Sequence, residues 1–162
     1  MKVIFLDIDG VLNTIDTFKR RKKIYKKTRV LIPRLDFYRI RYLKEIVKRT
    51  DAKIVITSSW RKYKSDMREL ESIFELFNLK IYGVTIVDKN GIRGNEIIDF
   101  LNKHDVETFV ILDDESCDLI GLEEYLIKTK DYWQAGLLKE HIDIAIDILN
   151  NSKKLILNNK EK

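Results

Sequence analysis

One stretch near the N-terminus indicates the class of fold: residues 3–10 read VIFLDIDG. Its first four residues form an uninterrupted apolar run, which is typical of a central strand buried on both faces. Asp7 and Asp9 follow with one residue between them, so in extended backbone both carboxylates leave the chain on the same side. Gly10 then permits a sharp turn. We therefore expect a buried parallel strand that delivers two carboxylates to its carboxyl end.

The remainder of the chain alternates apolar runs with amphipathic stretches. The pattern predicts further strands at 53–57, 81–87, 109–112 and 126–129, although 119–130 also fits a helix, and it predicts helices at 34–50, 65–77, 94–103 and 138–149. Pro33 would stand just before the first of these helices, and Ser65 would cap the second. Strands that alternate with helices predict an α/β fold of three layers, Rossmann-like, with a parallel sheet and helices on both faces. In such sheets, sites lie at the carboxyl ends of the strands.

Length and composition limit the classes of protein that the chain can represent. Its 162 residues suit one domain, which we expect to span 1–150, followed by a polar tail at 151–162. No apolar stretch approaches the roughly 18 residues of a membrane span, and the run before Asp7 is too short for a secretory signal. A single cysteine, Cys117, excludes an internal disulfide framework and has no histidine near it in sequence to activate the thiol. We therefore expect a cytoplasmic protein without a membrane partner, and the oligomeric state stays open.

The positive charge of the chain is concentrated in one segment. The formal net charge is +5, yet residues 17–34 carry nine Lys or Arg and no acidic residue, whereas the remainder has 22 basic and 26 acidic residues. A localised positive field suits a polyanionic partner. We predict a basic flap at 14–33 that binds RNA or DNA, with these candidate contacts: Lys19, Arg20, Arg21, Lys22 and Lys23. The alternative is a solvated loop without function.

A second acidic pair follows the apolar run at 109–112. Asp113 and Asp114 therefore also stand at the end of a predicted strand. Two carboxylates held close together repel each other unless a cation lies between them. The first pair, Asp7 and Asp9, therefore fits Mg²⁺ binding or a nucleophile paired with a general acid/base. Taken alone, this spacing also fits a helix cap or a solvated loop.

Three motifs in register resemble those of the haloacid dehalogenase-like (HAD) phosphatase superfamily. Residues 5–13, FLDIDGVLN, resemble its first motif, and residues 54–57, IVIT, resemble its second, an apolar strand that ends in Thr or Ser. Residues 111–114, with Asp118 four residues on, resemble its acidic fourth motif. These enzymes commonly insert a cap after the first motif or after the third strand. This chain has only residues 14–33 in the first position and almost nothing in the second. The resemblance is therefore to a branch without a full cap domain.

The resemblance implies roles for the acidic residues. Asp7 would be the nucleophile that forms an aspartyl-phosphate, and Asp9 would be the general acid and then the general base. Mg²⁺ would be held by Asp7, the backbone carbonyl of Asp9 and Asp114, with Asp113 or Asp118 assisting. An anionic nucleophile that attacks an anionic phosphate needs such a cation between them.

The resemblance also implies phosphate-binding residues. Thr57, or alternatively Ser58, would hydrogen-bond the phosphoryl oxygens, although these hydroxyls also fit a cap for the next turn. Arg93 is the candidate for the basic third motif, with Lys89 as its competitor and a plain surface arginine as the other interpretation. Arg61 would reach a substrate phosphate.

The implied activity is a Mg²⁺-dependent phosphomonoester hydrolase. Residues 93–97, RGNEI, resemble small HAD domains linked to RNA repair, and the open, basic site resembles the phosphatase half of polynucleotide kinase-phosphatases, which acts on 3′-phosphate ends. Trp60 would then stack on a base, or else pack in the core. The alternatives are a nucleotidase-like phosphatase for small molecules, a non-catalytic nucleic-acid-binding module and a Mg²⁺ nuclease.

Overall fold

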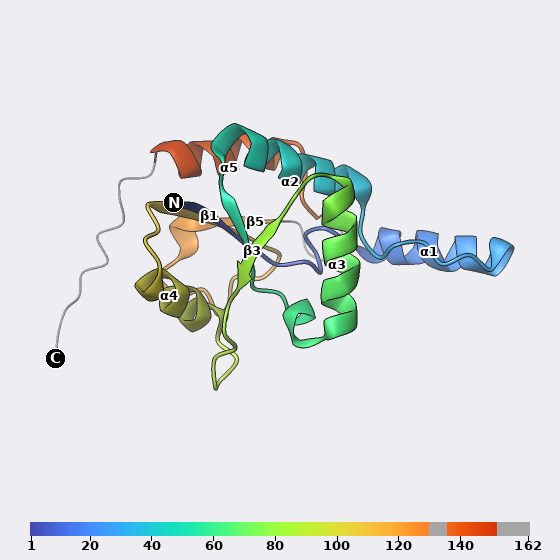
Figure 1. Cartoon of the computed structure of the whole chain (residues 1–162), viewed down its shortest axis with the longest axis horizontal. Coiled ribbons are helices and arrows are strands. Elements are labelled where there is room, and N and C mark those ends of the chain that lie inside the picture. The colour runs from blue at the N-terminus through green and yellow to red at the C-terminus, as the bar shows by residue number, and fades with distance from the viewer. Residues whose placement is uncertain (130–135, 152–162) are drawn as a thin grey trace.

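The structure is a computed structural model that describes residues 1–129 and 136–151. Its centre is a five-stranded sheet in the order β3-β2-β1-β4-β5, and every neighbouring pair is parallel (Figure 1). The strands are β1 Lys2–Leu6, β2 Lys53–Ile56, β3 Ile81–Val84, β4 Thr108–Asp113 and β5 Leu126–Lys128. The predicted Rossmann-like parallel sheet is thereby confirmed, and the stretch that also fitted a helix supplies the edge strand β5.

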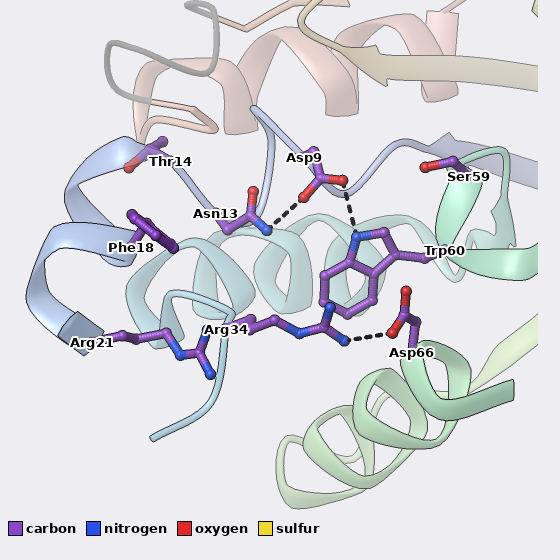
Figure 2. A pocket seen from close by; sticks show the side chains of 9 residues that line it. All are labelled: Asp9, Asn13, Thr14, Phe18, Arg21, Arg34, Ser59, Trp60 and Asp66. Atoms are coloured by element: carbon purple, nitrogen blue, oxygen red, sulfur yellow. Dashed lines mark hydrogen bonds and ion pairs between the residues drawn. The ribbon is translucent and has the colours of Figure 1, made fainter. Parts of the chain in front are cut away.

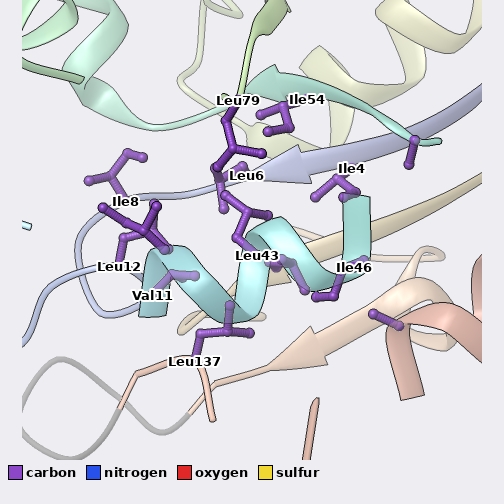
Figure 3. Close-up of a cluster of buried hydrophobic side chains, with 14 of the residues drawn as sticks. Ile4, Leu6, Ile8, Val11, Leu12, Leu43, Ile46, Ile54, Leu79 and Leu137 are labelled. Carbon is purple, nitrogen blue, oxygen red and sulfur yellow. The ribbon is translucent and has the colours of Figure 1, made fainter. Parts of the chain in front are cut away.

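Helices cover both faces of the sheet. They are α1 Ile15–Thr28, α2 Phe37–Thr50, α3 Lys64–Leu76, α4 Arg93–Lys103 and α5 Glu140–Asn151, with short 3₁₀ turns η1 Ser59–Lys62 and η2 Glu123–Tyr125. Ile4 and Leu6 of β1 point to the face covered by α2, α3 and α5, and Figure 3 shows part of that cluster. Val3 and Phe5 point to the other face, where α4 packs. Because β1 is buried on both sides, its sequence is continuously apolar.

Several expected helix boundaries differ from the observed ones, including the last helix, which was predicted at 138–149 and is α5 at Glu140–Asn151. Helix α2 begins at Phe37, after the helix cap Asp36, whose carboxylate accepts a hydrogen bond from the Tyr38 N–H at 2.9 Å. Pro33 therefore lies in the connection and not at the helix start. Helix α3 begins at Lys64 without a side-chain cap, so Ser65 stands inside its first turn.

Strand β3 ends at Val84 and not at residue 87 as predicted. Its partner β2 ends at Ile56, and the last backbone hydrogen bond between the two segments runs from the Thr85 N–H to the Ile56 carbonyl at 3.0 Å. Beyond that point the chain has no strand to pair with, although its residues remain β-branched.

The basic segment is a helix and not an irregular flap. Helix α1 occupies Ile15–Thr28, and Figure 1 shows it projecting from the body of the molecule. Thr17 is its one buried residue, so the helix has almost no apolar face from which the sequence could predict it. It is the one helix between β1 and α2, at the position where the sequence predicts a basic flap in place of a cap domain. Of the predicted tail at 151–162, Asn151 is the last residue of α5, and residues 152–162 lie outside the described residues. None of the described helices has the length and apolarity that a bilayer crossing needs.

Candidate active site

The parallel register of the central strands brings distant aspartates together. Leu6 of β1 pairs with Leu112 of β4, and the Asp7 N–H donates to the Leu112 carbonyl at 3.0 Å. Asp7 and Asp113 therefore leave neighbouring strands at one edge of the sheet. With Asp114 they form a group in which one carboxylate oxygen of each residue lies within 4.8 Å of those of the other two. Asp7 is 5% exposed and Asp113 is fully buried, so this is a concentrated negative charge in a place with little water.

The turn after the first motif is built around Gly10. Its φ of +79° lies in the left-handed region, and a Cβ added there would overlap the carboxylate of Asp114. Glycine thus leaves the space that Asp114 occupies. Thr129, just beyond β5, donates its hydroxyl to the Gly10 carbonyl at 2.9 Å and its N–H to the Asp113 carbonyl at 2.8 Å. Both acidic loops are therefore tied to the end of β5.

The three carboxylates fit a divalent cation. Burial raises the pKa of Asp7 from 3.8 to about 7 against the opposing effect of the Arg93 guanidinium, and the carboxylates of Asp113, Asp9 and Asp114 raise it further. Burial likewise raises the pKa of Asp113. A cation held between these hard oxygen donors would relieve the repulsion and favour the ionised forms.

Arg93 supplies the positive charge that faces this group. It begins α4, and its Nη1 forms an ion pair with Asp113 and lies 3.4 Å from Asp7 Oδ1. Lys89, the competing candidate, is exposed in the loop before α4. Of the two, the structure brings Arg93 to the aspartates.

Asp118 fixes the start of helix α4 and does not join the group of three carboxylates. Its carboxylate accepts from the Arg93 N–H at 3.1 Å, and its carbonyl accepts from the Gly94 N–H at 2.9 Å. A Cβ at position 94 would lie 2.7 Å from the same carbonyl, so only glycine permits this approach. Asp118 thereby positions the backbone that carries Arg93.

The side chain of Asp9 lies apart from the three carboxylates. Its Oδ1 accepts from Asn13 Nδ2 at 2.8 Å and its Oδ2 accepts from Trp60 Nε1 at 3.0 Å (Figure 2). Both oxygens are thus oriented by N–H donors, an arrangement that suits a proton-transfer group better than a side-chain metal ligand. Coordination through the Asp9 backbone carbonyl stays a prediction.

The two candidate hydroxyls of the second motif differ in their surroundings. Thr57 follows β2, its N–H donates to the Leu6 carbonyl at 3.0 Å, and its fully buried hydroxyl has no hydrogen-bond partner within the described residues. Ser58 Oγ accepts from the Trp60 N–H at 3.4 Å and caps η1. The capping interpretation therefore holds for Ser58. A buried hydroxyl without a partner, such as that of Thr57, is the kind of group that a ligand oxygen satisfies.

Arg61 does not reach toward a substrate, contrary to the expectation from the sequence. Its side chain is 5% exposed and forms an ion pair with Glu96 of α4. The same guanidinium donates to the carbonyls of Thr57, of Ser58 at 2.6 Å and of Thr85 at 3.1 Å. Four donor contacts thus commit Arg61 to holding the second-motif loop against α4.

Trp60 packs in the core, which is one of the two interpretations that the sequence left open, and its ring is not exposed for stacking on a base. It is 4% exposed, and the guanidinium carbon of Arg34 lies 4.0 Å from the centroid of its ring. Arg34 is itself held by Asp66 at 2.9 Å and Glu69 at 2.8 Å. The indole contributes to the site through its N–H, which reaches Asp9.

A cavity of about 240 Å³ opens beside Asp9, between α1, the connection to α2 and η1. Figure 2 shows its lining: Asp9, Asn13, Thr14, Phe18, Arg21, Arg34, Ser59, Trp60 and Asp66. Of the five basic candidates on α1, Arg21 alone lines this cavity. Lys19, Lys22 and Lys23 are exposed on the helix, and Arg20 lies 3.6 Å from Asp36.

Three residues of the site carried no signal that sequence reasoning used. Asn13 stood in the first motif without a role, and Glu96 follows Arg93 by three positions, which is the spacing of one helical turn. Thr129 had no local signal at all, because its contact depends on β5 lying beside β4.

Comparison with known proteins gives one match. The family described as the HAD domain in Swiss Army Knife RNA repair proteins matches residues 3–142, which include every residue of the site described above. No curated protein and no solved structure matches the chain.

Proposed function

The chain belongs to the family of HAD domains found in Swiss Army Knife RNA repair proteins, and on that premise we propose that it is a Mg²⁺-dependent phosphomonoester hydrolase. The observation that carries the proposal is the convergence of Asp7, Asp113 and Asp114 at one sheet edge, with Arg93 against them. A nucleophile, a cation site and a phosphate-binding cation within one small volume are what phosphoryl transfer requires.

The first half-reaction transfers the phosphoryl group to the protein. An oxygen of Asp7 attacks phosphorus, the bond from phosphorus to the leaving oxygen breaks, and Asp9 gives its proton to that oxygen. Asn13 and Trp60 hold the Asp9 carboxyl in a single orientation for this transfer. The Arg93 guanidinium favours the ionised, nucleophilic form of Asp7.

The second half-reaction regenerates the protein. Asp9, now a carboxylate, takes a proton from water as the water oxygen attacks phosphorus and the bond between phosphorus and Asp7 breaks. Inorganic phosphate leaves. The Thr57 hydroxyl, which has no partner among the described residues, and the Arg93 guanidinium would contact the phosphoryl oxygens in both steps.

Mg²⁺, held by Asp7, Asp114 and the Asp9 carbonyl, with Asp113 beside it, would neutralise the charge between nucleophile and phosphate. The donor set supports this ion because all its members are oxygens and because burial, the largest cause of the raised pKa values of Asp7 and Asp113, disfavours carboxylates that a bound cation would stabilise.

The substrate that we propose is the 3′-phosphate end of a nucleic acid. Helix α1 starts directly after the first motif and carries its basic residues into solvent, so a polyanion bound along it would lead into the site. The small cavity beside Asp9 supports a second candidate function, a phosphatase for mononucleotides. A mononucleotide would fill the cavity without contacting the part of α1 that lies outside the lining.

Release of inorganic phosphate tests the proposal. We expect the protein to dephosphorylate a 3′-phosphorylated oligonucleotide only with Mg²⁺, and Asp7→Asn to lower the rate by at least about a thousandfold. Asp99→Asn, which removes a half-exposed carboxylate of α4, is the matched control and should leave the rate unchanged. Equal activity of Asp7→Asn would exclude the mechanism, and cuts within the strand would indicate a nuclease.

A further inference from the structure

One face of α1 lines the cavity beside Asp9 and takes no part in the chemistry above. The lining residues of the helix and its cap are Thr14, Phe18 and Arg21, which follow one another at four and three positions. That spacing places them in one stripe along a helix. Because Asp9 is also part of the lining, whatever enters the cavity lies against the group that would protonate the leaving oxygen.

Thr14 brings an unused hydroxyl to this stripe. It occupies the cap position of α1, where threonine commonly bonds a helix N–H, yet it makes no such bond. The residue is 1% exposed, and its hydroxyl has no partner within residues 1–129 and 136–151. Such a group is costly unless a ligand satisfies it.

Phe18 brings an accessible aromatic ring. It is 51% exposed, whereas Trp60, the other aromatic residue of the lining, is buried under Arg34. Phe18 is thus the one ring of this lining with a face open to a flat ligand.

Arg21 brings a cation without a carboxylate partner in the described part of the chain. Its Nε donates to the Ile32 carbonyl at 2.7 Å, which leaves the terminal nitrogens available. Arg34, by contrast, is neutralised by Asp66 and Glu69. Arg21 also marks the point where the cavity meets the exposed basic residues of α1.

We propose that this cavity is the leaving-group subsite and that it takes the terminal nucleoside of a nucleic-acid strand, an inference that rests on the proposed phosphatase function. Thr14 bonds a sugar oxygen, Phe18 stacks on the base, and Arg21 contacts the next phosphate of the strand. Outward from Asp9, the helix presents a hydroxyl, then a ring, then a cation. The sugar is the part of the nucleoside bonded to the reacting phosphate, and the base and the next phosphate both branch from that sugar, so both lie farther from Asp9. The volume of about 240 Å³ is below the ~300–1,000 Å³ typical of drug-sized ligands, so one nucleoside and not several would enter.

Kinetics with three substrates test this subsite: acetyl phosphate, a nucleoside 3′-phosphate and a pentanucleotide with a 3′-phosphate. For Phe18→Ala we expect KM to rise about tenfold for both nucleotide substrates, the loss typical of one stacked base. KM for acetyl phosphate, whose leaving group has no base, should not change. Phe18→Tyr, which keeps the ring, should restore the wild-type KM. Thr14→Val should raise KM for the two nucleotides several-fold and leave acetyl phosphate unaffected.

Arg21→Gln should raise KM for the pentanucleotide alone and reduce the slope of its salt dependence by about one. Arg68→Gln, which removes an exposed arginine of α3 that does not line the cavity, is the matched control. If wild-type protein hydrolyses all three substrates and the variants affect them equally or not at all, the subsite is overturned while the phosphatase function stands. If wild-type protein with Mg²⁺ hydrolyses none of them, both proposals fail.

Discussion

The buried hydroxyl of Thr57 allows one prediction in which stability and activity change in opposite directions. It has no hydrogen-bond partner among the described residues, so the folded protein bears the cost of removing it from water. For a buried polar group that cost is about 1–3 kcal/mol. Thr57→Val keeps the shape and removes the hydroxyl. We therefore expect the free energy of unfolding to rise by about 1 kcal/mol, which is a Tm increase of roughly 2–4 °C for a chain of this size.

The same substitution removes a donor that we propose for the phosphoryl oxygens. The loss of one such donor typically lowers kcat by about 10²–10³. Thermal unfolding followed by circular dichroism and phosphate release under saturating substrate measure the two effects on one sample.

Thr108→Val is the matched control for this experiment. Thr108 begins β4 at the opposite end of the strand from the site, and its buried hydroxyl donates to the Leu149 carbonyl at 2.8 Å. Its loss should lower the free energy of unfolding by about 1 kcal/mol and leave kcat unchanged. The reasoning is refuted if Thr57→Val destabilises the protein as much as Thr108→Val does and retains its activity.

Three further predictions concern the charges and the backbone of the site. Without metal, the free energy of unfolding should fall as pH rises from about 4 to about 7. Over this window the raised pKa of Asp7 keeps a proton on the folded protein that the unfolded chain has released. Thermal melts should therefore show that Mg²⁺ raises Tm more at pH 8 than at pH 5. Gly10→Ala should displace Asp114 and abolish the Mg²⁺-induced rise in Tm, whereas Gly91→Ala, also at positive φ but with open space around it, should lose a little stability and keep the Mg²⁺ response. Arg61→Met leaves the buried carboxylate of Glu96 without its ion-pair partner. It should lower the free energy of unfolding, measured by urea denaturation, by about 3–5 kcal/mol, and a change below about 1 kcal/mol would contradict the buried ion pair.

The strands and the positions of the acidic residues were accessible from the sequence because their signals are local. A strand buried on both faces is apolar along its length, and a carboxylate can stand only at the end of that strand. Residues 3–10 and 109–114 therefore indicate both the strand and the position of its carboxylates. The parallel order then requires that Asp7 and Asp113 meet at one edge.

Helix α1 shows where such signals were insufficient. A run of lysine and arginine predicts exposure equally well for a loop and for a helix, and these residues are good helix formers. With Thr17 as its one buried residue, α1 offers no apolar stripe from which its period could be inferred.

What the sequence alone determined is therefore the parallel sheet, the carboxyl ends of β1 and β4 and the residue types delivered to them. The tertiary structure decided which partner each polar group has: the indole of Trp60 reaches Asp9 across 51 positions, the hydroxyl of Thr129 reaches the Gly10 carbonyl across 119, and Arg61 turns to Glu96 and away from solvent. The physical reason is that apolar burial depends on local periodicity, whereas a hydrogen bond depends on atoms within about 3 Å whose distance along the chain carries no information.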